Sequence, residues 1–70
     1  RLQIAVNLRN RTTDAINLEI RTVFKDDKGI STGEETAWKD IFLEERQSIT
    51  WRAESVRKDA QSFTVEVRRP

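Results

Sequence analysis

Large apolar residues occupy every second position in several stretches of the chain. In the first stretch they are Leu2, Ile4, Val6 and Leu8. The same period returns in residues 16–24, after a polar run of turn-forming residues at 10–14, and again in residues 63–67. Because successive side chains of a β-strand point to opposite faces, the pattern predicts three half-buried strands.

A tight reversal is predicted at residues 25–29, which read Lys-Asp-Asp-Lys-Gly. The side chain of Asp26 can accept hydrogen bonds from nearby backbone groups, and Gly29 tolerates a positive φ. A hairpin partner for the second strand should therefore follow from about Gly29. The alternating ligands and distal glutamate of a calcium loop are missing, so we interpret these residues as a plain turn.

Residues 34–46 carry signals for both a helix and a strand. Their apolar residues fall at helical spacing, as Ala37, Trp38, Ile41 and Phe42. The alternation of Ile41 and Leu43 instead indicates a strand, which would pair with the segment that follows it across a short turn. We favour the strand, and the helix stays open as the alternative.

The chain between residues 47 and 61 predicts a strand followed by a turn. Ile49 and Trp51 alternate with polar residues, as expected for a strand at residues 47–54. Residues 55–61 are expected to form one short helical turn with Val56 and Ala60 on its inner side.

Composition limits the fold and removes most catalytic chemistry. The chain has 70 residues, of which 36% are apolar and 36% charged, typical of a single thin two-layer domain spanning residues 1–70. Histidine and cysteine are absent, so imidazole acid–base catalysis, thiol nucleophiles and the common zinc sites are excluded. Ser55 and Lys58 have the Ser-x-x-Lys spacing of penicillin-recognising enzymes, but the companion motifs are missing. We therefore predict neither an enzyme nor a bound cofactor or metal.

Charge gives few clues to a partner. Thirteen Lys and Arg against twelve Asp and Glu leave a formal charge of +1, far from the strongly basic balance of proteins that bind nucleic-acid backbones. Four arginines lie near the ends of the first and last predicted strands and could converge on a phosphate or another anion. They are Arg9, Arg11, Arg68 and Arg69. Charges on outer faces also block edge-to-edge aggregation, and we prefer this solvated-strand interpretation.

The two tryptophans allow two interpretations. Trp38 and Trp51 could form a stacking platform for bases or sugars. We expect both in the core instead, because a domain of this size needs their apolar area. For the binding interpretation, the candidate residues are Arg9, Arg11, Arg68, Arg69 and Trp38.

No stretch of this chain predicts a membrane span, because no apolar run approaches the roughly 18 residues that crossing requires. The chain also shows no signal peptide. It starts with Arg1, and the strand pattern begins at once with Leu2. We expect a domain excised from a longer precursor.

The order of motifs along the chain carries a family resemblance. An Asn10-Arg11-Thr12 turn precedes a long strand that ends in the pattern F-x-D-x-x-G, from Phe24 to Gly29. Trp38 follows, and the last strand has the pattern F-x-V-x-V-R, from Phe63 to Arg68. This order resembles that of the YcfL-like proteins, the DUF1425 family of small bacterial envelope lipoproteins.

The resemblance implies an all-β fold, a small antiparallel immunoglobulin-like β-sandwich of about six to seven strands. It also implies a location in the periplasm, with an outer-membrane lipid anchor on a cysteine upstream of this chain, and it supplies no catalytic residues. The family pattern maps onto Asn10, Asp26, Gly29 and Trp38. We expect a turn at the first two, positive φ at Gly29 and a core position for Trp38.

By this analogy we expect a non-enzymatic envelope module that binds another envelope protein or a cell-wall component. Exposed sheet edges would suit a peptide added as a strand, and an oligomer through such edges stays open. The alternative is a small β-barrel that binds nucleic acid or an anion through the arginines and an exposed tryptophan, and we favour it less.

Overall fold

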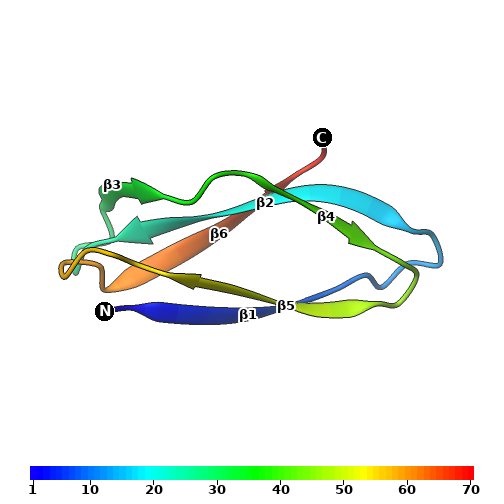
Figure 1. The fold of residues 1–70 in the computed structure, drawn as a ribbon, viewed down its shortest axis with the longest axis horizontal. Coiled ribbons are helices and arrows are strands. Elements are labelled where there is room, and N and C mark those ends of the chain that lie inside the picture. The colour runs from blue at the N-terminus through cyan, green and yellow to red at the C-terminus, as the bar shows by residue number, and fades with distance from the viewer.

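The computed structural model describes residues 1–70 as six antiparallel strands in two sheets (Figure 1). The strands are β1 (Gln3–Arg9), β2 (Ile16–Lys25), β3 (Ser31–Glu35), β4 (Lys39–Leu43), β5 (Ser48–Glu54) and β6 (Ser62–Arg68). The molecule is elongated, with extents of 40 × 20 × 18 Å. The predicted all-β fold, a small β-sandwich, is confirmed.

Sheet A contains only β1 and β5, which form the lower layer in Figure 1. The two strands pair antiparallel along their whole length, with Ile4 opposite Ala53 and Val6 opposite Trp51. Residues directly opposite one another point to the same face. The apolar side chains of both strands therefore form one face, which is turned toward the second sheet.

Sheet B is built around β2, which pairs on both of its edges. Strand β6 follows one edge from Glu19 to Lys25. Strands β4 and β3 share the other edge, β4 along the first half of β2 and β3 along the second. The chain between β3 and β4 carries Trp38. This arrangement makes β2 the central strand of the molecule.

The core lies between the two sheets. Ile4 of β1, Phe24 of β2 and Ala60 form a buried cluster against which Trp51 and Val65 pack. Ile20 of β2 is fully buried, and Leu43 at the end of β4 is only 2% exposed. The apolar alternation that predicted the strands therefore marks the faces that meet in the sandwich.

The preferred strand at residues 39–43 is confirmed, but its predicted pairing is wrong. Strand β4 pairs with β2, not with β5, and residues 44–47 carry the chain from sheet B across to sheet A. Strand β4 therefore belongs to sheet B and β5 to sheet A. The crossing lets each strand bury its apolar face against the other layer.

The helical turn predicted at residues 55–61 is also wrong, because this segment is an irregular loop. Ser55 Oγ accepts a hydrogen bond from the Arg57 N–H at 3.0 Å, a local bond that competes with a helical turn. Val56 is consequently 70% exposed, whereas Ala60 is buried as expected.

The predicted turns are confirmed, each with a clear physical cause. Asp26 Oδ1 accepts hydrogen bonds from the Lys28 and Ile30 N–H groups, at 2.9 and 3.0 Å, and Gly29 has a φ of 78°. Asn10 is almost fully buried, and its side-chain amide donates to the carbonyl oxygens of Asp14, Leu43 and Glu44. Asn10 thus holds together the β1–β2 connection and the β4–β5 connection.

The structure has no helix long and apolar enough to cross a membrane.

Candidate functional site

Trp38 lies on the outer face of sheet B, so its predicted core position is wrong. The guanidinium carbon of Arg68 is 3.9 Å from the centre of the indole ring, and that of Arg21 is 4.7 Å away. Arg21 points outward because its neighbours Ile20 and Thr22 are fully buried between the sheets. Trp38 belongs to the β3–β4 connection, where no alternating pattern specifies a face.

Carboxylates surround the two arginines beneath Trp38. Arg21 bonds Glu66 at 2.5 Å and approaches Glu35 at 3.4 Å, while Arg68 bonds Glu19 at 2.9 Å. Such partly exposed ion pairs contribute about 0–1 kcal/mol each. The cluster ties β2, β6 and the β3–β4 connection together, and its positive charges are already paired.

The other candidate arginines do not join this cluster. Arg9 lines an apolar pocket between the sheets, and Arg69 borders a separate surface hollow beside Thr12. Arg11 is exposed in the loop after β1. Of the four predicted arginines, the structure brings only Arg68 against Trp38.

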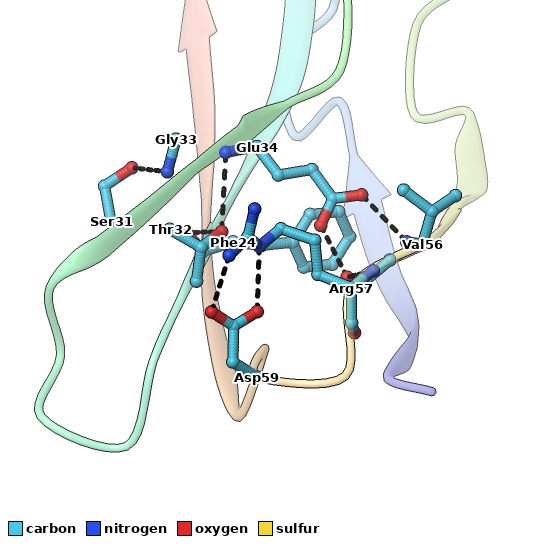
Figure 2. Close-up of polar contacts among 9 residues, drawn as sticks. Phe24, Ser31, Thr32, Gly33, Glu34, Val56, Arg57 and Asp59 are labelled. Atoms are coloured by element: carbon cyan, nitrogen blue, oxygen red, sulfur yellow. Dashed lines mark hydrogen bonds and ion pairs between the residues drawn. The ribbon is translucent and has the colours of Figure 1, made fainter.

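A polar clamp joins the two sheets where β3 lies against the β5–β6 loop (Figure 2). The carboxylate of Glu34, on β3, accepts a hydrogen bond from Ser55 Oγ at 2.5 Å and from the Val56 N–H at 2.8 Å. Arg57 forms a two-bond ion pair with Asp59, with both distances at 2.8 Å. The clamp therefore fixes the β5–β6 loop against sheet B.

These contacts shift the ionisation of two carboxyl groups. The Ser55 hydroxyl, the Val56 N–H and the nearby Arg57 charge lower the pKa of Glu34 below its ordinary value of 4.5. The hydrogen bonds from Arg57 lower the pKa of Asp59. Both groups are charged at neutral pH.

The clamp also accounts for the Ser-x-x-Lys spacing noted in the sequence. Ser55 is fully buried, and its hydroxyl is bonded to Glu34 and to the backbone of Arg57, while Lys58 is exposed. This environment is that of a structural serine. Sequence reasoning missed the partner Glu34, because nothing in a single sequence links positions 34 and 55.

The structure groups no three metal-ligating side chains closely enough to hold a metal ion.

The outer edge of β1 is a candidate docking edge. Ser55 N–H donates to the carbonyl oxygen of Leu2 at 2.8 Å, and Asn10 N–H donates to that of Gln47 at 2.9 Å. Since backbone groups alternate sides along an antiparallel strand, the even-numbered residues of β1 face β5. The backbone groups that point to the free edge belong to Gln3, Ala5, Asn7 and Arg9.

An apolar pocket lies between the sheets near the end of this edge. Leu8 and Arg9 of β1 line it together with side chains of β2, β4 and β6. Its other lining residues are Ile16, Leu18, Ile20, Ile41, Leu43 and Val67. Two-stranded sheet A thus covers the inner face of sheet B incompletely.

Comparison with known proteins gives a family and no closer relative. No curated protein sequence and no solved structure matches the chain. The family model described as a protein of unknown function, DUF1425, matches residues 1–69. This match covers all six strands, the polar clamp and the Trp38 cluster, and the chain therefore belongs to the DUF1425 family.

Proposed function

We propose that this domain is a non-enzymatic binding module of the bacterial cell envelope that takes an extended segment of a partner protein along the free edge of β1. One observation carries the proposal: the free backbone edge of β1 ends beside an apolar pocket between the sheets, which Leu8 and Arg9 line. A strand added there would widen sheet A, and its inward side chains would reach the pocket beside Leu8.

The family resemblance supports the cellular setting. A periplasmic location and an outer-membrane lipid anchor upstream of this chain form part of the proposal. Ser55, the serine of the Ser-x-x-Lys spacing, has a structural partner, because its hydroxyl donates a hydrogen bond to Glu34.

The alternative function, binding of nucleic acid or an anion, has less support. Arg68 is stacked on Trp38 and bonded to Glu19, so its guanidinium is not held ready for a phosphate. Arg9 and Arg69 lie beside two different pockets. The two packed sheets also differ from the small barrel that this alternative assumed.

Two matched proline substitutions test the docking edge. Ala5 lies opposite Arg52, and their backbone groups face the two opposite edges of sheet A. Ala5→Pro removes a donor from the free edge of β1, whereas Arg52→Pro removes one from β5, and each leaves the β1–β5 hydrogen bonds in place. The immobilised domain is incubated with solubilised envelope proteins, with cell-wall sacculi and with single-stranded DNA.

We expect wild type and Arg52→Pro to retain the same envelope protein and Ala5→Pro to lose it. Equal retention by all three variants would contradict docking at β1. Retention of sacculi alone would replace the protein partner by a cell-wall ligand, and salt-sensitive binding of DNA would favour the alternative function.

A further inference from the structure

Strand β6 presents an apolar edge that the fold leaves uncovered. Phe63 lies opposite the buried Phe24, and Val67 lies opposite the buried Ile20, so both side chains point to the inner face of sheet B. Phe63 is nevertheless 39% exposed and Val67 46% exposed. Sheet A has only two strands and does not extend over them.

The backbone of β6 is also open on this side. Thr22 bonds Thr36 through both its N–H and its carbonyl oxygen, each at 2.9 Å, so these groups face the β3–β4 edge of β2. The groups of Arg21 and Val23 then face β6, where their partners are Glu66 and Thr64. The backbone groups that point away from β2 consequently belong to Phe63, Val65 and Val67.

Natural sheets usually protect such edges with charged side chains, above all lysine, with proline or with a bulge. Between Ser62 and Val67, β6 has no lysine, proline or bulge, its one charged residue, Glu66, is paired with Arg21 of β2, and its pairing with β2 is regular. The three residues with outward backbone groups are the same three that carry apolar side chains on the inner face. This combination is expected at an edge that another strand covers.

We propose that β6 pairs antiparallel with β6 of a second copy of this chain, around a two-fold axis at Val65. In this register Val65 lies opposite its own equivalent, and Phe63 lies opposite Val67 of the second copy. Every outward N–H and carbonyl group of these three residues then gains a partner. Each exposed phenylalanine meets an exposed valine, a favourable cross-strand pair.

The polar face of β6 suits the same register. Glu66 lies opposite Thr64 of the second copy, and Arg68 lies opposite Ser62, so no like charges face each other directly. Moving the axis to Glu66 would place two glutamates opposite one another. Moving it to Thr64 would leave Val67 opposite Gln61. Self-complementarity at Val65 is the reason to choose a second copy over an unrelated strand.

Reciprocal charges test both the partner and the register. The variant Phe63→Lys/Val67→Lys places lysines opposite lysines in the dimer, and Phe63→Glu/Val67→Glu places glutamates opposite glutamates. Analytical ultracentrifugation of wild type should show a monomer–dimer equilibrium, and each variant alone should self-associate at least about tenfold more weakly. An equimolar mixture should recover a one-to-one heterodimer.

Phe42→Lys is the matched control, because Phe42 is 61% exposed but lies on β4. It should dimerise like wild type, and circular dichroism should show that all variants fold. Amide exchange provides a second measurement that needs no variant. In wild type, the amides of Phe63, Val65 and Val67 should exchange more slowly as protein concentration rises.

A wild-type protein that stays monomeric at all concentrations would overturn the proposal, as would a dimer that both charged variants preserve. Slow exchange of these amides in a monomer would also overturn it, because another strand would then occupy the edge. None of these results bears on the β1 edge, so the dimer and the proposed function fail separately.

Discussion

The two tryptophans have different roles, and a substitution at each should show it. Trp51 packs against the core, and its indole N–H donates to the buried Thr22 hydroxyl at 2.8 Å. Trp51→Ala should therefore lower the free energy of unfolding by about 3–5 kcal/mol. Trp38→Ala loses mainly contacts with two partly exposed guanidiniums and should cost about 1–2 kcal/mol.

Urea denaturation of both variants measures these costs, with fluorescence of the remaining tryptophan as the signal. A larger loss of unfolding free energy for Trp38→Ala than for Trp51→Ala would mean that the stability of the core depends on the Trp38 cluster. The sequence could predict the position of Trp51, which alternates with Ile49 and Ala53 in a strand. It could not predict the position of Trp38, which lies between two strands.

Asn10 should be among the most sensitive polar positions. Its side-chain amide bonds three carbonyl oxygens, and Asn10→Ala would leave the Leu43 oxygen without this buried donor. Unpaired buried groups cost about 1–3 kcal/mol each, so we expect a loss of about 2–3 kcal/mol in the free energy of unfolding. Asn7→Ala is the control, because Asn7 is exposed and bonds only Thr50.

Thermal and urea unfolding of the two alanine variants should separate them clearly. Equal stability would show that solvent replaces the bonds of Asn10. Asn10-Arg11-Thr12 also has the N-x-T pattern of a glycosylation sequon. The nitrogen that a glycan would modify is buried and hydrogen-bonded inside the protein. The sequence alone contains the sequon but not this burial.

Between elements, the clamp from β3 to the β5–β6 loop should respond to acid. The pKa of Glu34 is lower in the folded protein than its ordinary value of 4.5, so the carboxylate contributes stability above that pH. The contribution is lost as the pH falls through the lowered value. Glu34→Gln should therefore be less stable than wild type near neutral pH, with a difference that shrinks in acid.

Urea denaturation across the acid range measures this difference, and Glu45→Gln controls for loss of one negative charge in a loop. Carbon-13 NMR of the Glu34 carboxyl group offers a direct check. A titration midpoint at or above 4.5 would contradict the assignment of the Ser55 and Val56 hydrogen bonds as its cause.

The positions of the strands were more predictable than the pairing of one strand with another. A period of two identifies a strand and its buried face, which is why β1, β2 and β6 correspond to the alternating stretches. The period says nothing about which strand lies alongside, so the pairing of β4 with β2 was missed. The docking edges follow from the pairing order and were equally hidden.

Across the whole molecule, protection from solvent should decrease from β2 outward. Strand β2 is paired on both edges and carries the fully buried Ile20 and Phe24. Its amides should exchange only on global unfolding, whereas the outward amides of Ala5 and Asn7 should exchange quickly in the free domain. Native-state hydrogen exchange measures this order, and slow exchange of the outward amides in the isolated monomer would contradict it.

The pairing of β1 with β5 has a consequence for how the chain folds. Residues 10–47 separate these two strands, and residues 26–61 separate β2 from its partner β6, so most stabilising contacts must wait for closure of long loops. Refolding in milliseconds to seconds is expected for such a topology. During synthesis β1 emerges well before β5, the strand it pairs with, which leaves an apolar strand without its partner until residues 48–54 have been made.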